Sequence, residues 1–120
     1  LFGRRDKRIG REDMMNAVES DVEKLVQKEL ESANQKFPMF RSDHEGAAVI
    51  FEEIEEAEHE LNEVRFEFKE MWRSVKLNIG GIPFCEAVLK RSLNLACEAI
   101  QVAAMAQKFI DSKKEREKSE

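Results

Sequence analysis

Glycine and proline are scarce in this chain of 120 residues, with five and two copies respectively. A fold of many strands needs a turn after each strand, and these two residues are among the commonest turn formers. Their shortage therefore argues against a many-stranded β fold. Tyrosine is absent, so the aromatic residues of any core must come from eight phenylalanines and one tryptophan.

Long apolar runs and basic stripes are missing as well. No stretch has the length and apolarity of a transmembrane helix, so we expect no membrane partner. The formal net charge is −5 and Lys and Arg do not gather in one stripe, so we expect no nucleic-acid partner. The negative charge is concentrated in residues 41–80, which hold five basic and eleven acidic residues.

Only two cysteines occur, Cys85 and Cys97, and their spacing fits neither a CxxC motif nor a disulfide framework. Both fall in a helical pattern, so we expect buried free thiols. The sequence also has no segment with the features of a secretory signal. These features together predict a cytoplasmic protein in a reducing compartment.

Apolar residues recur with a helical period along most of the chain and predict an all-α fold. The first helix is expected over residues 11–36. The second begins at a capping box, with Ser42 as the N-cap and Glu45 three residues later, and ends before Gly80. Pro83 suits the first turn of a third helix, which is apolar over more than half of its circumference.

The second helix carries an apolar seam with alternating steps of three and four residues, which is typical of helices packed in a coiled-coil manner. A third helix that is apolar on two sides needs more cover than two other helices provide. We therefore expect an antiparallel helical bundle of three long helices, completed by oligomerisation into a homodimer or homotetramer. The seam consists of Ala47, Ile50, Ile54, Ala57, Leu61, Val64, Phe68, Met71 and Val75.

The length of the chain fits a single domain over residues 1–120. Its two ends, residues 1–10 and 113–120, are rich in charge and poor in apolar residues, so we expect both to fray.

Residues 52–60 read EEIEEAEHE, and six of these nine are acidic. A solvated helix face is one interpretation of such a run. However, like charges four residues apart repel by about 0.2–0.5 kcal/mol per pair, and no Lys or Arg is interspersed here. At about 100° per residue, Glu53, Glu56 and Glu60 also form a column beside the apolar seam. Carboxylates at the edge of a core need protons or cations, and oxygen ligands favour a hard divalent cation.

The third helix carries one polar stripe through its apolar surface. Glu98 belongs to this stripe and is the only acidic residue of the helix between Glu86 and Asp111. The stripe is either an exposed strip, a buried polar pair that fixes the packing of the bundle, or the place where Glu98 completes the carboxylate set of the second helix. It consists of Arg91, Asn94, Glu98, Gln101 and Met105.

These acidic segments resemble the MazG-like all-α nucleoside triphosphate pyrophosphohydrolases, in particular a phage and prophage branch. The similar stretches are residues 40–61 (FRSDHEGAAVIFEEIEEAEHEL) and 98–110 (EAIQVAAMAQKFI). The resemblance implies a hydrolase that uses Mg²⁺, with Mn²⁺ as an alternative. Such an enzyme cleaves nucleoside triphosphates, ribo or deoxy, to a nucleoside monophosphate and pyrophosphate.

By this resemblance, Glu52, Glu53 and Glu56 match the family motif EExxE, whose carboxylates bind the metal. Glu98 matches the glutamate of a second motif, ExxD, and Gln101 stands where that motif has its aspartate. The implied metal ligands are therefore Glu53, Glu56, Glu98 and Gln101. Glu52 or Glu53 would be the catalytic residue that orients or deprotonates the attacking water.

Three basic residues, Arg91, Lys69 and Arg73, are candidates for binding the phosphates of the substrate, although each also fits a plain surface charge. Two other functions stay open. One is a non-catalytic helical oligomerisation protein, in which the seam is an interface and the acidic residues keep the surface solvated. The other is a degenerate family member that binds nucleotide without turnover.

Overall fold

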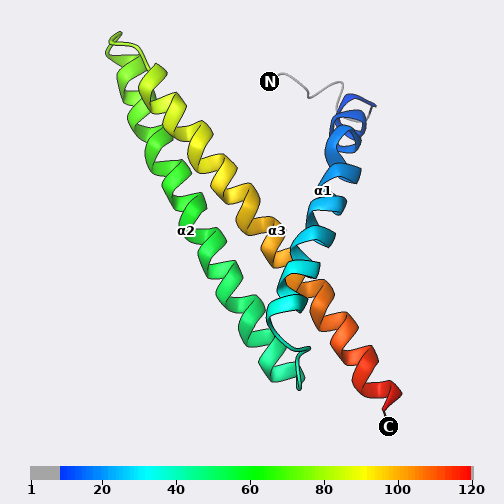
Figure 1. The fold of residues 1–120 in the computed structure, drawn as a ribbon. Helices are drawn as coiled ribbons and strands as arrows, with labels where there is room; N and C mark the ends of the chain where they lie inside the picture. Colours follow the sequence, from blue (N-terminus) through cyan, green and yellow to red (C-terminus); the bar gives the residue numbers. More distant parts are fainter. Residues whose placement is uncertain (1–8, 120) are drawn as a thin grey trace.

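The structure, a computed structural model, describes the backbone of residues 9–119 and the side chains from residue 17 onward. Three helices account for nearly all of this part: α1 (Ile9–Lys36), α2 (Asp43–Lys76) and α3 (Ile82–Lys118). No strand occurs between residues 9 and 119, so the all-α prediction is confirmed. Figure 1 shows α2 and α3 as a long antiparallel pair. The C-terminal part of α1 crosses α3 near the middle of α3, and the N-terminal part of α1 lies away from the pair.

The start of α2 follows from its capping residues. Ser42 is the N-cap, and its Oγ accepts a hydrogen bond from the backbone N–H of Glu45 at 3.0 Å. The Glu45 carboxylate accepts from the backbone N–H of Arg41 at 2.8 Å, one residue earlier than in a regular capping box. These two hydrogen bonds hold the α1–α2 connection against the first turn of α2.

The turn between α2 and α3 uses two residues with a left-handed backbone, Asn78 (φ 59°) and Gly80 (φ 83°). The left-handed backbone predicted at the glycines after α2 therefore also occurs at Asn78. Asparagine tolerates a left-handed backbone better than most residue types. Pro83 lies in the first turn of α3, as expected from its fixed φ.

The C-terminal part of α3 is fastened to the start of α2. The Lys113 ammonium donates to the Asp43 carboxylate at 2.8 Å, and the Arg116 guanidinium donates to the other oxygen of the same carboxylate. Helix α3 continues to Lys118, and the fraying expected for residues 113–120 stays a prediction. The corresponding expectation for residues 1–8 lies outside the described residues.

The backbone of Phe40 is held by the same end of α3. Its N–H donates to Ser112 Oγ at 2.9 Å in a buried hydrogen bond, and its carbonyl oxygen accepts from Arg116 at 2.8 Å. The Phe40 side chain is buried beside them. The connection between α1 and α2 is therefore pinned to α3 at a fixed place.

The first turn of α2 approaches α3 closely because Gly46 has no side chain. A Cβ atom at this position would lie 2.6 Å from Cδ2 of Phe109 and 2.9 Å from Cδ2 of Phe40. Both distances are shorter than carbon atoms tolerate, and the atoms belong to the bodies of packed rings. The glycine is therefore required by the packing of the two helices.

We expect Gly46→Ala to lower the free energy of unfolding by about 1–2 kcal/mol. An alanine in a helix normally gains about 0.5–1 kcal/mol over glycine, but forcing extra volume into a packed site costs about 1–3 kcal/mol. Urea unfolding followed by circular dichroism measures the difference. In a Phe109→Leu background the loss should shrink, and a Gly46→Ala protein more stable than wild type would contradict the tight packing.

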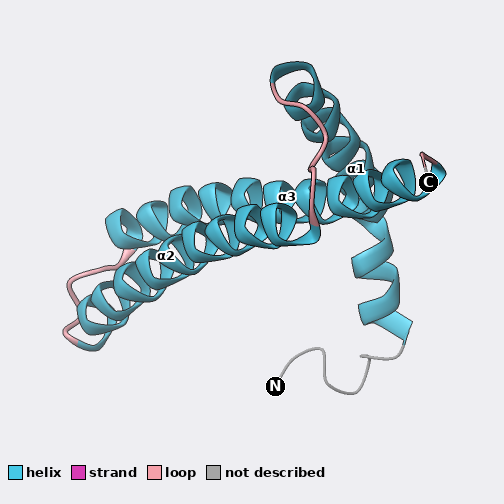
Figure 2. Cartoon of the chain, turned by 90° about the horizontal axis from the view of Figure 1, so that it is seen from below, coloured by secondary structure: helices cyan, strands magenta, loops and turns pink. Residues whose placement is uncertain are grey.

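The molecule is elongated, with extents of 65 × 32 × 21 Å and a radius of gyration of 18.7 Å. A compact chain of this length would have a radius of gyration of about 14 Å. Among the described residues, helix α1 packs on α3 and not on α2, and Figure 2 shows it crossing α3. The buried apolar side chains are few and include Leu30, Phe40 and Ala104. The core is therefore small and lies where α1 crosses α3.

Large parts of the predicted seam and of α3 are uncovered. Phe68 on the seam is 51% exposed, and Cys85 and Cys97 are exposed free thiols. The predicted burial of the cysteines is thus wrong, because α2 covers only one side of α3 along this stretch. None of the helices in the described part of the chain combines the length and the apolarity needed to cross a membrane.

Candidate active site

Helices α2 and α3 bring three carboxylates together. One oxygen atom from each of Glu53, Glu56 and Glu98 lies within 4.8 Å of the other two. Glu53 and Glu56 stand about one turn apart on α2, and Glu98 comes from the middle of α3. The antiparallel pairing of the two helices therefore assembles a cluster from residues more than forty positions apart in the sequence, which we call the carboxylate cluster.

The surroundings of the carboxylate cluster disfavour its negative charges. Burial raises the pKa of Glu53 above its ordinary value, and the charges of Glu56, Glu52 and Glu29 raise it further. Burial also raises the pKa of Glu98, with further contributions from Glu56, Glu53 and Glu60.

Three carboxylate oxygens at this place are buried without a hydrogen-bond partner among the described residues: Oε2 of Glu53, Oε1 of Glu98 and Oε1 of Glu60. A buried polar atom without a partner costs free energy, and a buried charge costs more. A proton or a cation would remove this cost. Carboxylate oxygens are the ligands that Mg²⁺ and Mn²⁺ prefer, so the residues present fit such an ion.

Glu52 lies beside the carboxylate cluster on the outer side of α2, where its side chain is exposed. It lines a shallow acidic hollow together with Glu56 and Glu98 of the cluster and with Glu55, His59 and Glu60. The structure therefore places Glu52 within the same surface feature as two of the candidate metal ligands, but on its solvent side.

Arg91 is the basic candidate nearest to the carboxylate cluster. It comes from α3 and contacts two acidic residues of α2, with 3.2 Å between Nη2 and Oε1 of Glu63 and 3.9 Å between Nη1 and Oε1 of Glu60. Arg91 thus carries its positive charge to the edge of the acidic hollow, and its partners are glutamates of the neighbouring helix.

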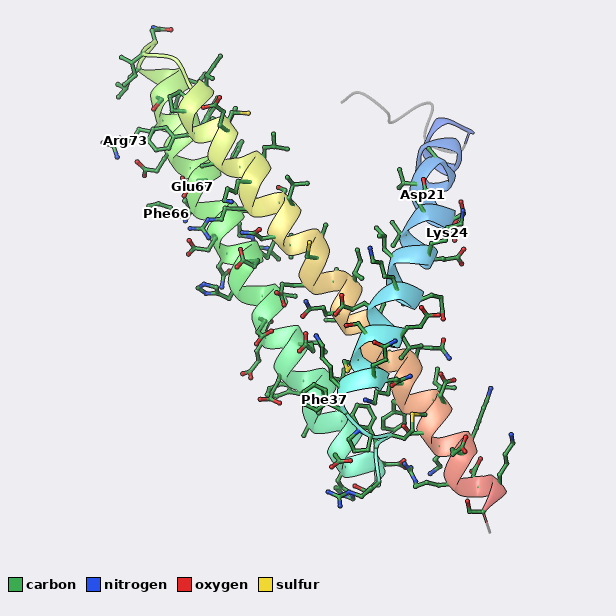
Figure 3. The ribbon with its side chains drawn as sticks, in the orientation of Figure 1. Asp21, Lys24, Phe37, Phe66, Glu67 and Arg73 are labelled. Atoms are coloured by element: carbon green, nitrogen blue, oxygen red, sulfur yellow. The ribbon has the colours of Figure 1, made fainter. Side chains whose placement is uncertain are left out.

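Lys69 and Arg73 lie farther away. They follow Glu56 by 13 and 17 residues on α2, which corresponds to about 20 and 26 Å of straight helix. Arg73 pairs with Glu70 at 3.6 Å, and Figure 3 shows it near the end of α2 remote from α1. The structure does not bring these two basic residues to the carboxylates of the same chain.

A cavity of about 560 Å³ adjoins the carboxylate cluster where α1 crosses α3. Glu53 lies on its wall and so belongs to both features, and Gln101 lies on the same wall. The rest of the lining is mostly apolar, and all three helices and the α1–α2 connection contribute to it. The apolar part of the lining consists of Ala33, Phe37, Pro38, Phe40, Val49 and Met105, and the charged Glu29, Arg41, Glu45 and Lys108 also line the cavity.

Sequence reasoning missed the cavity and the buried Lys108. The polar stripe of the third helix was followed through Glu98 and Gln101 to Met105, and the next helical step along that face is Lys108. Extending the stripe by one step would have placed a basic residue on the same face as Glu98. Nothing in the sequence, however, indicates that α1 crosses at this point and encloses it.

Gln101→Asp tests whether this position belongs to the carboxylate cluster. Without metal, we expect the variant to have a free energy of unfolding about 1 kcal/mol below that of wild type, because a further carboxylate adds repulsion. It should therefore also melt at a lower temperature. With Mg²⁺ the deficit should disappear and metal affinity should rise. Calorimetric titration and thermal melts measure both, with Gln27→Asp on exposed α1 surface as control. Equal metal affinity in variant and wild type would remove Gln101 from the candidate ligands.

Three converging carboxylates beside a largely apolar cavity are able to hold a divalent cation next to an organic ligand. The cation would neutralise the negative charge of the cluster. Comparisons of the chain with protein-family models, with curated proteins and with solved structures found no match.

Proposed function

We propose that the protein is a Mg²⁺-dependent pyrophosphohydrolase that cleaves nucleoside triphosphates, ribo or deoxy, to a nucleoside monophosphate and pyrophosphate. The observation that carries the proposal is the convergence of Glu53, Glu56 and Glu98 beside a cavity large enough for a nucleoside. The resemblance of residues 40–61 and 98–110 to the MazG-like family points to the same chemistry.

In this proposal Glu53, Glu56 and Glu98 hold the metal, and Gln101 adds a neutral amide oxygen. The metal, when bound, supplies the positive charge that lets phosphates approach the acidic surface. Glu52, exposed beside the carboxylate cluster, accepts a proton from the water that attacks phosphorus. Arg91 offers its guanidinium to phosphate oxygens at the edge of the hollow.

Product analysis of a panel of nucleoside triphosphates tests the proposal. With millimolar Mg²⁺ we expect pyrophosphate and nucleoside monophosphate in equal amounts, and neither product in EDTA. Release of single phosphates would indicate a phosphatase instead. Binding of nucleotide without any product would favour the degenerate family member, and neither binding nor product would reject a nucleotide function.

We further propose that a second copy of the chain covers the exposed apolar groove of the α2–α3 pair and forms a homodimer or homotetramer. Phe51 and Ile110 on this groove are 59% and 46% exposed, and contiguous apolar patches of this kind usually mark interaction surfaces. Two-fold symmetry is the commonest way in which identical chains cover one another. The groove consists of Ala47, Ile50, Phe51, Ile54, Ala106, Phe109 and Ile110.

Light scattering measures the mass in solution, and we expect a multiple of 13.9 kDa. Phe51→Glu should shift the wild-type assembly toward the monomer, because a charge would then be buried without a partner. A wild-type monomer would contradict the interface. An oligomer that neither binds nor cleaves nucleotide would favour the oligomerisation protein over the hydrolase. A cytoplasmic location, where both exposed cysteines stay reduced, completes the proposal.

A further inference from the structure

The lining of the cavity beside the carboxylate cluster includes the buried Lys108, for whose ammonium group the proposed hydrolysis gives no role. We propose that this cavity binds the nucleobase of the substrate and that Lys108 selects bases that carry a ring carbonyl oxygen. The identity of the ligand as a nucleotide rests on the proposed function. The selectivity follows from the chemistry of the cavity itself.

Lys108 is placed where a lysine is rarely found without a partner. Its side chain is 2% exposed. The only hydrogen bond that the described residues give it is a long one, 3.5 Å from Nζ to the carbonyl oxygen of Phe37. The ring of Phe40 lies 5.1 Å from the ammonium, which adds a cation–π contact. An ammonium has three N–H donors, so this site leaves donor capacity unused.

The burial of Lys108 is imposed by the packing around it. Phe40 is fixed by the hydrogen bond of its N–H to Ser112, one turn farther along α3, so the ring cannot easily move away from the ammonium. Burial holds the pKa of Lys108 below its ordinary value, and the charge of Glu45 opposes this effect. A group that is costly to bury and has few partners is expected to find an acceptor in a ligand.

The dimensions of the cavity fit a nucleoside attached to the carboxylate cluster. Glu98, Gln101, Met105 and Lys108 follow one another at steps of three, four and three residues, so they lie along one face of α3. Lys108 is about 10 Å beyond Gln101 and about 15 Å beyond Glu98 along the helix. Phosphates held at the cluster would therefore leave the base at the Lys108 end.

The wall between these two ends suits a flat aromatic ligand. Met105 and the two phenylalanines of the connection line it. Figure 3 shows Phe37 where the end of α1 meets the other two helices, and its side chain is 63% exposed. An exposed ring at the mouth of an apolar cavity is able to stack on a base, whichever base is bound. Selectivity must then come from the polar groups of the lining, and Lys108 is the buried one among them.

An ammonium donates hydrogen bonds and accepts none. Guanine, cytosine, thymine and uracil each carry at least one ring carbonyl oxygen, whereas adenine carries none. A carbonyl oxygen would fill the unused donor capacity of Lys108, and a base without this oxygen would leave the donors buried and unpaired. Sites built to hydrogen-bond a ligand group discriminate strongly against analogues that lack it.

The test uses nucleosides in EDTA, so that it needs neither phosphate, metal nor turnover. Inosine and adenosine form the matched pair, because they differ by a carbonyl oxygen against an amino group at position 6. Chemical-shift titration of the full chain should show inosine binding at least about tenfold more tightly than adenosine, with shifts at the cavity residues. Hydrolysis assays on the same samples report separately on the proposed function.

Lys108→Met keeps an unbranched side chain, one atom shorter, and removes the ammonium. We expect it to melt at or above the wild-type temperature, because an isolated buried charge is gone, and to bind inosine and adenosine equally. Lys114→Met, on the exposed side of the same helix, is the control. A second variant, Phe37→Ala, should weaken the binding of inosine and of adenosine by the same factor, so that the ratio of the two affinities stays unchanged. This variant remains informative even if the fold does not tolerate a change at Lys108.

The inference is overturned if wild type does not prefer inosine, or if Lys108→Met retains the wild-type preference. Selective inosine binding by a protein that cleaves no nucleotide would uphold the base site and reject the proposed function. Hydrolysis with equal use of adenine and carbonyl-bearing nucleotides would uphold the proposed function and reject the role of Lys108.

Discussion

Glu53→Gln is expected to lower the rate of pyrophosphate release about a hundredfold or more while the helices stay intact. Glu53 is the one residue shared by the carboxylate cluster and the wall of the cavity, so in the proposed reaction its charge would lie between the metal and the substrate. Removing one fixed electrostatic partner of a reaction centre typically costs about 10²–10³ in rate. Steady-state pyrophosphate release with saturating Mg²⁺ measures the loss.

Stability gives this experiment a second readout. Because the pKa of Glu53 is raised by burial and by neighbouring carboxylates, the neutral amide should leave the metal-free protein as stable as wild type or more stable. Glu58→Gln, at an exposed position of the same helix, is the matched control. Glu63 is unsuitable as a control because it contacts Arg91. A Glu53→Gln protein that retains wild-type turnover would remove Glu53 from the site.

Without divalent metal, the protein is expected to become less stable as the pH rises above about 4.5. The pKa values of Glu53 and Glu98 are raised above their ordinary value of 4.5 in the folded protein. Between the unfolded and folded pKa values the folded state therefore binds more protons, and the free energy of unfolding falls as pH increases. The pKa of Asp43 is lowered by the Lys113 hydrogen bond, so its stabilising effect is lost only at pH values below this window.

Mg²⁺ should reverse this loss at pH 7.5. A ligand that binds only the folded state stabilises it by about 2.7 kcal/mol at one hundred times its dissociation constant, which for a chain of this size raises the melting temperature by about 10 °C. Thermal melts in EDTA and in Mg²⁺ across pH 4–8 measure both effects. The double variant Glu53→Gln/Glu98→Gln should show neither the pH slope nor the metal response. Identical wild-type melts with and without Mg²⁺ would exclude the metal site.

The parts of the structure that follow from local signals were predictable from the sequence. Ser42 and Glu45 mark the start of α2 because a capping hydroxyl satisfies backbone donors that no helix satisfies by itself. The column of Glu53 and Glu56 follows from helical geometry alone. Glu98, the one acidic residue on the polar stripe of its helix, was one of the alternatives for that stripe, and the resemblance to the MazG-like family favoured it.

The cavity was not predictable, because it depends on packing between distant segments. Leu30 of α1 and Ala104 of α3 are both buried, and periodicity does not reveal which side chains of two distant helices pack together. The same holds for Lys108, which has the sequence context of a surface residue. Lys108 is buried beside the ring of Phe40, whose backbone N–H donates to Ser112 Oγ of α3. The exposure of Cys97 likewise reflects which side of α3 the neighbouring helices leave uncovered.

The α1–α2 connection, which lines the proposed nucleobase cavity, is fastened to the last turns of α3. The C-terminal turns of α3 therefore support this cavity although they do not line it. A chain cut before Lys113 would keep every carboxylate of the cluster and every side chain that lines the cavity. It would nevertheless lose both charged partners of Asp43 and the Arg116 contact to the Phe40 carbonyl. Because exposed ion pairs weaken as salt is added, nucleoside affinity at the cavity should depend on ionic strength through residues that never touch the ligand.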